Sequence, residues 1–292
     1  MSLATRLRRH EGSRYDGLSE GSAAMVIRQY SSSFGLASLL LAAPVRAQVR
    51  NVYALVRVAD EIVDNPDPAL GLGARDRMLT WLQDDVHHAL ENGFSANLVV
   101  HAFARTAVGC GIAADVVDPF FASMRMDLET KVHTPETFDR YVFGSAEVVG
   151  LLCLRVFLAD VESRDQTYDR LAPGARRLGA AFQKLNFLRD LAEDHDVLGR
   201  CYFPGLDVDT FCDDDRDRIL DDVALDLDAA AGVIPDLPLS SRRAVRVAHA
   251  TFAELAARLR ATPAAEIRRT RIRVPDPVKL RLAAGAFYGD HS

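Results

Sequence analysis

The segment from Val49 to Asp64 constrains this chain most, because it places carboxylates on a helix that is otherwise apolar. Its later polar residues are Arg57, Asp60, Glu61 and Asp64, at steps of three, one and three, so a helix presents them as one stripe. Most of such a helix is buried, and the polar stripe then faces a partner. A single Asp-x-x-x-Asp pair remains a weak signal, because short motifs of this kind are common on solvated faces.

A second segment of the same kind lies at residues 178–194. Its polar row is Gln183, Asn186, Asp190 and Asp194, spaced three, four and four residues apart on one helical face. Two separate buried salt-bridge networks are a poor explanation of this repetition, because each is costly to desolvate. The repeated pattern instead favours a shared function for the two rows.

Facing carboxylates suit a hard divalent cation, which prefers oxygen ligands. Mg²⁺, with Mn²⁺ as the alternative, is usually held by one or two carboxylates together with substrate phosphates. Arg57 and Arg189 fit the role of anion clamps, because a guanidinium stays charged and binds phosphate oxygens bidentately. The expected metal ligands are five side chains of the two rows, namely Asp60, Asp64, Asn186, Asp190 and Asp194.

Several stretches together resemble the squalene/phytoene synthase family. They are YSSSFGLASLLL (30–41), VYALVRVADEIVD (52–64), YVFGSAEVVG (141–150), QKLNFLRDLAED (183–194) and GRCYFP (199–204). The resemblance is collinear from about Ser31 to Lys279. It implies a single all-α domain with the isoprenoid synthase fold, a helical bundle around a central cavity that binds two allylic prenyl diphosphates with Mg²⁺. In the family, ionisation of one substrate leads to a cyclopropylcarbinyl diphosphate, whose rearrangement gives a linear triterpene or tetraterpene.

The resemblance also implies roles for residues outside the two rows. Ser31, Ser33 and Phe34 match an element whose hydroxyls sit near the diphosphate, and Tyr141 matches a tyrosine that hydrogen-bonds diphosphate or the leaving group. Gln183 and Asn186 would orient metal-bound water or the second diphosphate. Asp127 resembles a structural helix partner. The expected catalytic residues are Asp60, Asp64, Asp190, Asp194, Arg57 and Tyr141, and the expected substrate-binding residues are Ser31, Ser33, Phe34, Arg57, Gln183, Asn186, Arg189, Arg273 and Lys279.

One departure from the family pattern concerns Ser145-Ala146-Glu147, where the family commonly shows Val-Ala-Gly. Glu147 lies in a long apolar run and therefore needs a cationic partner from elsewhere in the chain. A structural ion pair is favoured over a general base, because the ionisation chemistry requires no base. The departure leaves the shape of the deep pocket, and with it the prenyl chain length, open.

Helical periodicity dominates the rest of the chain, and Pro and Gly cluster between helical stretches. We expect a flexible basic arm at residues 1–19 followed by one helical domain at 20–292. Among the expected helices are those at residues 20–42, 44–64, 135–160 and 173–196. Pro44 and Pro173 would stand in first turns, where proline is tolerated.

Composition limits the partners and the compartment. The net charge of −6 argues against nucleic acid as a partner, and the four cysteines lack CxxC spacing, as in a reduced cytoplasmic protein. No apolar run reaches the roughly 18 residues of a membrane span. Peripheral membrane contact through Arg6, Arg8 and Arg9 of the N-terminal arm remains the alternative to a solvated arm.

The leading functional hypothesis is head-to-head condensation of two prenyl diphosphates by a phytoene-type enzyme. A squalene-type reaction, which would add NADPH as a cofactor, is the nearest variant. The same motifs are compatible with transfer of a prenyl group to a small aromatic acceptor or with cyclisation of one prenyl diphosphate, because a scaffold does not fix its substrate. A non-catalytic assembly or interaction protein is the remaining alternative.

Overall fold

The structure is a computed structural model of the chain, and it describes residues 13–30, 37–67 and 69–288. Within these ranges the chain folds into helices joined by loops, and its only β-type pairing is an isolated parallel bridge between Val132 and Cys201. The expected all-α class is therefore confirmed.

The helices follow one another in this order: α2 (Arg14–Tyr30), α4 (Ala43–Val63), α5 (Leu72–Asn92), α6 (Leu98–Cys110), α7 (Ala114–Glu129), α8 (Pro135–Val142), the π-turn η1 (Phe143–Glu147), α9 (Val148–Phe157), α10 (Arg164–Arg189), α11 (Leu191–Asp196), α12 (Asp213–Ala231), α13 (Leu239–Ala261), α14 (Ala264–Ile267) and α15 (Asp276–Tyr288). Short 3₁₀ turns, η2 (Val208–Thr210) and η3 (Ile234–Asp236), flank α12.

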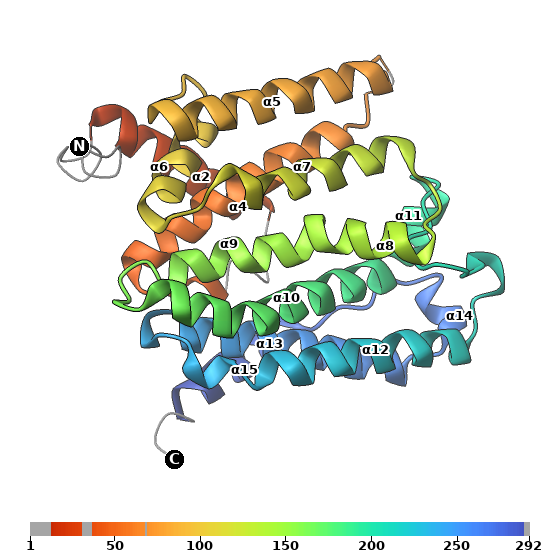
Figure 1. Cartoon of the computed structure of the whole chain (residues 1–292). Helices are drawn as coiled ribbons and strands as arrows, with labels where there is room; N and C mark the ends of the chain where they lie inside the picture. The colour runs from red at the N-terminus through yellow and green to blue at the C-terminus, as the bar shows by residue number, and fades with distance from the viewer. Residues whose placement is uncertain (1–12, 31–36, 68, 289–292) are drawn as a thin grey trace.

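The helices stack into a layered bundle, with α5 along one side and α12, α13 and α15 along the opposite side (Figure 1). One apolar cluster joins α4 to α5, α6, α7 and α9, through residues such as Leu55, Leu79 and Phe103. A second cluster joins α10 to α12 and α13, through residues such as Leu188 and Val223. The two acidic rows, on α4 and at the end of α10, therefore belong to different halves of the core.

The N-terminal boundary differs from the sequence-based expectation. Helix α2 begins at Arg14 instead of Glu20, so residues 14–19 are helical and not part of an arm. Asp16 explains the earlier start, because its side chain is 9% exposed and bonds Nε2 of His101 on α6 at 2.8 Å. Residues 1–12, which include Arg6, Arg8 and Arg9, lie outside the described residues.

The expected helix 20–42 does not extend to Ala42. Residues 39–41 form a turn, and Ala42 precedes α4 with its N–H bonded to the carbonyl of Ser240. Arg46 stabilises this turn by donating from Nη2 to the carbonyls of Leu39 and Leu41 at 2.9 and 2.8 Å. Pro44 stands in the first turn of α4, as expected.

Two other long helices differ internally from the expectation. The expected helix 135–160 ends at Phe157 and contains the π-turn η1, which inserts a wider turn before Glu147. The expected helix 173–196 starts earlier, at Arg164, and has Pro173 in its interior. It also breaks at Asp190, which separates α10 from α11. Tyr168, which lies under the guanidinium of Arg155 at 3.6 Å, anchors the additional first turns of α10 on α9.

Within the described residues, we find no helix whose length and apolar content would allow it to cross a membrane.

Candidate active site

The first acidic row lies at the C-terminal end of α4, whose apolar face is buried in the core. Arg57 forms an ion pair with Glu61, and its Nη1 lies 3.9 Å from Oδ2 of Asp60. The guanidinium also lies 4.5 Å from the ring centroid of Tyr30 on α2. Its Nε is buried and bonds no other described residue. Arg57 is thus held in place, with one donor still available.

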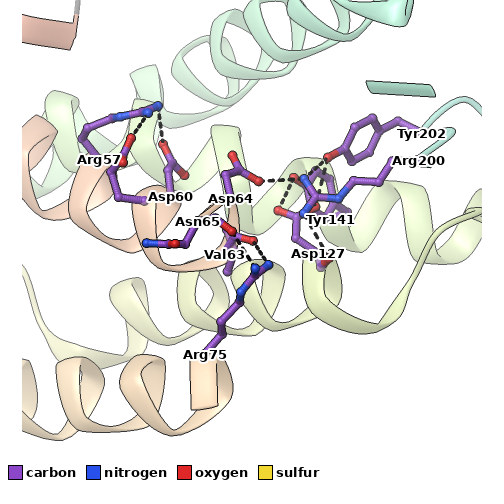
Figure 2. A network of polar contacts seen from close by, with 11 residues as sticks. Arg57, Asp60, Val63, Asp64, Asn65, Arg75, Asp127, Tyr141, Arg200 and Tyr202 are labelled. Atoms are coloured by element: carbon purple, nitrogen blue, oxygen red, sulfur yellow. Dashed lines mark hydrogen bonds and ion pairs between the residues drawn. The ribbon is translucent and has the colours of Figure 1, made fainter. Parts of the chain in front are cut away.

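Asp64 ends the first row and connects it to a distant part of the chain (Figure 2). Its Oδ1 accepts a hydrogen bond from Nη1 of Arg200 at 2.9 Å. The loop that follows is fixed by Arg75, which donates to the carbonyls of Val63 and Asn65 at 3.2 and 2.5 Å. The carboxylate of Asp64 is therefore oriented from one side by Arg200, and the loop behind it by Arg75.

Asp127 of α7 sits beside this pair (Figure 2). Its Oδ2 accepts the hydroxyl proton of Tyr141 at 2.7 Å, and its Oδ1 accepts that of Tyr202 at 3.0 Å. The Asp127 side chain is only 5% exposed. The expectation that Asp127 is a structural helix partner is thus supported, because it joins α7 to α8. Tyr141 lies next to the acidic rows, but its hydroxyl is bonded to Asp127.

The second acidic row lies where α10 ends and α11 begins. Asp190 accepts hydrogen bonds from Nε of Arg189 at 2.9 Å and pairs with Nε of Arg271 at 2.9 Å. One turn later, the main-chain carbonyl of Asp194 accepts the N–H of Arg200 at 2.8 Å. Asp190 is therefore paired with cations on its own helix and on the segment before α15.

Three carboxyl groups at the junction of the two rows have raised pKa values. Burial raises the pKa of Asp60 to about 8, although 32% of its side chain is accessible. The nearby guanidinium of Arg57 lowers this pKa, and the carboxylates of Asp64 and Asp127 raise it further. Burial likewise raises the pKa of Asp194 to about 7, with added repulsion from Asp190 and Asp64. The pKa of Asp127 rises to about 6, chiefly through burial. Because Arg200 bonds both the carboxylate of Asp64 and the main-chain carbonyl of Asp194, the two rows meet in one region.

A cavity of about 520 Å³ lies beside the second row. Arg189, Arg273 and Lys279, three cations expected to bind substrate, all line it, and Arg271 is a fourth. Phe252 of α13 adds an apolar wall. The structure therefore gathers residues from three distant parts of the chain around a basic, partly apolar space. Arg57, Asp60 and Asp64 are not among the described residues that line it.

The remaining expected substrate-binding residues lie partly within and partly outside the described residues. Gln183 and Asn186 are half-buried on α10, before Asp190 on the same face. Ser31, Ser33 and Phe34 lie outside the described residues. The roles assigned to all these side chains stay predictions.

Glu147 has the cationic partner that its apolar surroundings require. Its Oε2 accepts a hydrogen bond from Nε of Arg176 on α10 at 2.6 Å, and the Glu147 side chain is 17% exposed. The guanidinium of Arg176 also lies 5.0 Å from the ring centroid of Phe143. The interpretation of Glu147 as one half of a structural ion pair is therefore supported.

Comparison with known protein families shows to which family this chain belongs. The squalene/phytoene synthase model matches residues 27–277. The chain belongs to the squalene/phytoene synthase family. The match spans α4, α10 and α11, and hence both acidic rows, and it ends within α15.

Individual family members agree with this assignment. A 15-cis-phytoene synthase of Enterobacter agglomerans is 29% identical over 255 residues, which cover 77% of this chain and 80% of that protein. A bifunctional lycopene cyclase/phytoene synthase of Leptosphaeria maculans is 24% identical over 290 residues, which cover 87% of this chain. The matched part makes up only 48% of that fungal protein, so this chain corresponds to about half its length.

Solved structures confirm the fold. The crystal structure of a dehydrosqualene synthase in complex with ligand superposes with a TM-score of 0.77 at 18% identity, covering 94% of this chain and 96% of that one. The expected isoprenoid synthase fold is therefore confirmed for this member of the squalene/phytoene synthase family.

The carboxylates of this squalene/phytoene synthase family member fit a divalent cation shared with a substrate. No group of three or more His, Cys, Asp or Glu side chains in the described ranges lies close enough to hold a metal ion alone. Mg²⁺ does not require such a cage, because one or two carboxylates plus phosphate oxygens usually complete its shell. The crowded carboxylates and their raised pKa values fit a site that accepts positive charge.

Three polar residues of the site were missed by sequence reasoning. Arg200 and Tyr202 lie in GRCYFP, which carried the family resemblance, but neither was assigned a role. Arg271 was assigned no role either, although Arg273 and Lys279, which follow it closely in the sequence, were expected to bind substrate. The available signal was the position of GRCYFP directly after the second acidic row, since a short loop keeps its residues close to that row.

Proposed function

We propose that this chain is a divalent-metal-dependent prenyltransferase that condenses two prenyl diphosphates head to head and releases diphosphate. The observation that carries the proposal is the meeting of two carboxylate rows at Arg200, together with a cavity next to the second row that is lined by four cations, in a squalene/phytoene synthase family member. Such a pairing of acidic and basic groups suits a diphosphate bridged to the protein by divalent metal.

Asp60 and Asp64 from one row, with Asp190, Asp194 and the Asn186 amide from the other, would hold the metal. Bound Mg²⁺ would neutralise the charge that develops on the leaving diphosphate. Mn²⁺ fits the same oxygen ligands. Of these side chains, Asp64 is already oriented by Arg200 and Asp190 by Arg271, so part of the site is preorganised.

The cationic side chains of the cavity bind and orient the diphosphate groups. Arg189 and Arg271 flank Asp190, and Arg273 and Lys279 line the same cavity. Charge-assisted hydrogen bonds from such groups are stronger than neutral ones, and they grow in value as the leaving group gains charge. These residues therefore assist departure of diphosphate from the allylic carbon.

Apolar side chains exclude water from the reacting carbon. Phe182 of α10 and Phe252 of α13 stack with ring centroids 3.7 Å apart, which closes the wall beside the cations. Phe187 and Tyr202 stack at 4.0 Å next to Tyr141. A carbocation formed among these rings meets the second prenyl chain before it meets water.

Phytoene-type condensation is our leading assignment, because two relatives matched over 80% and 87% of their own length bear the name 15-cis-phytoene synthase. The test is incubation of the purified protein with Mg²⁺ and geranylgeranyl or farnesyl diphosphate, with and without NADPH, followed by mass analysis. A C40 hydrocarbon formed without NADPH is the expected result. A C30 hydrocarbon that requires NADPH would reassign the reaction to the squalene type.

A test variant and its matched control for this assay both lie on α11. Asp194→Asn should abolish product formation, because it removes a carboxylate of the second row. Asp196→Asn should leave product formation near the wild-type level, because Asp196 is exposed and pairs with Arg268. Consumption of diphosphate substrate only after addition of an aromatic acceptor would refute condensation of two prenyl diphosphates.

A further inference from the structure

Arg200 connects the two acidic rows physically. Its guanidinium donates from Nη1 to Oδ1 of Asp64 at 2.9 Å, which belongs to the first row. Its main-chain N–H donates to the carbonyl of Asp194 at 2.8 Å, which belongs to the second row. One residue therefore holds the first row by its side chain and the second by its backbone.

The backbone of Arg200 is itself fixed. Gly199 adopts a positive φ of 64°, which lets the chain reverse after α11. The N–H of Cys201 then donates to the carbonyl of Lys131 at 2.8 Å, in the connection between α7 and α8. Arg200 thus projects from an anchored segment, and its side chain is only 10% exposed.

The surroundings of Arg200 are strongly acidic. Besides Asp64, its Nη2 bonds the main-chain oxygen of Asp127 at 3.2 Å, and its Nη1 lies 3.9 Å from Oδ1 of the same residue. Its charge also acts on the carboxylate of Asp194. Within the described part of the chain, no other Arg or Lys forms an ion pair with Asp64. Without Arg200, three carboxylates from three helices would repel one another.

We propose that Arg200 is a positioning residue that keeps the two acidic rows at their working separation and balances their charge until a divalent cation arrives. The inference rests on the proposed function, since it takes these rows as the carboxylates that bind the cation. Arg200 acts through Asp64 and the Asp194 segment, and it need not touch the substrate. A divalent cation and Arg200 then partly substitute for each other in holding the rows together.

The test compares thermal unfolding of the full chain in EDTA and in Mg²⁺ with inorganic diphosphate. In EDTA, Arg200→Gln should lower the Tm by roughly 5 °C, since it leaves carboxylates unpaired at the junction of the rows. Mg²⁺ with diphosphate should close more than half of this gap. Arg200→Lys, which keeps the charge, should show a smaller gap. In an Asp64→Asn background, Arg200→Gln should cost less than in the wild type.

Arg268→Gln is the matched control, because Arg268 pairs with Asp196 and Asp209 near the same loop but with no expected metal ligand. Its Tm gap should not change with Mg²⁺. A gap for Arg200→Gln that is equal in both buffers would overturn the inference. If Arg200→Gln does not fold in EDTA, refolding in Mg²⁺ with diphosphate supports the inference, and failure to refold there contradicts it. A wild-type Tm that is the same in EDTA and in Mg²⁺ with diphosphate would instead count against the proposed function.

Discussion

At the scale of single residues, ionised Asp60 lowers the free energy of unfolding of the metal-free protein. Burial and neighbouring carboxylates raise its folded-state pKa to about 8, above the ordinary aspartate value. A raised carboxyl pKa costs stability progressively as pH rises from about 4 to about 8, because the unfolded state releases the proton first. Asp60→Asn should therefore stabilise the protein in EDTA at pH 8 by about 1–2 kcal/mol, after allowance for solvent screening.

The measurement is urea unfolding of both proteins in EDTA at several pH values. The stabilisation should largely vanish near pH 3, which lies below the ordinary aspartate pKa of 3.8, because Asp60 is then mostly protonated in both the folded and the unfolded state. Asp196→Asn serves as the control of opposite sign, since hydrogen bonds from Arg268 and His195 lower the pKa of Asp196. Loss of stability in Asp60→Asn at pH 8 would show that Asp60 is held by a favourable ion pair instead.

Some residues of the candidate site could be predicted from the sequence, and others could not. The two acidic rows were recognisable because each is a local pattern, set by helical spacing within one segment. Arg200 was not recognised, because its partner Asp64 lies 136 positions away and the pairing depends on how distant helices pack. Arg271 likewise acquires its role only through contact with Asp190, 81 positions away. Local spacing identifies the candidate carboxylates, whereas their counter-charges come from tertiary structure.

At the scale of helices, α9 and α10 approach closely through glycine. A Cβ on Gly150 would overlap the carbonyl oxygen of Ala175, and one on Gly179 would overlap that of Ala146. Gly150→Ala should therefore force α9 and α10 apart and destabilise the protein by about 1–3 kcal/mol. Because α10 carries the second acidic row, the metal-dependent activity that we propose for the protein should fall as well.

A glycine in open space provides the control for this helix contact. Gly109 lies near the end of α6, and a Cβ added there would have no atom of a neighbouring side chain or segment within 4 Å. Gly109→Ala should stabilise the protein by up to about 1 kcal/mol, because alanine has the higher helix propensity. Thermal unfolding of the two variants side by side decides the matter. Equal effects would contradict a tight contact between α9 and α10.

Helix boundaries were predicted less well than helix existence, for physical reasons. Pro173 signals a helix start in isolation, yet packing of Tyr168 and Arg155 supports helical turns before it. The π-turn at Phe143–Glu147 has no local signature comparable to a proline or a cap, and it adjoins the close contact of Gly144 with α7. The break at Asp190 coincides with its ion pairs to Arg189 and Arg271.

At the scale of the whole molecule, the all-α isoprenoid synthase fold was predictable from the collinear motifs. Motif order along the chain matches a family whose helices surround one site, and the superposition on a dehydrosqualene synthase agrees. The placement of the basic cavity was not predictable, because its lining comes from α10, α13, α15 and the segment before α15. Spacing within one helix says nothing about which other helices it meets.

We propose that both acidic rows bind one metal–diphosphate cluster. The most direct measurement is a crystal structure of the protein with Mn²⁺ and a non-reactive prenyl thiodiphosphate, in which Mn²⁺ is located by its anomalous scattering. We predict anomalous peaks at ligand distance from carboxylates of both rows, Asp60 or Asp64 on one side and Asp190 or Asp194 on the other, with the diphosphate contacted by Arg189 or Lys279. Peaks at only one row, or a diphosphate bound away from both rows, would contradict the claim.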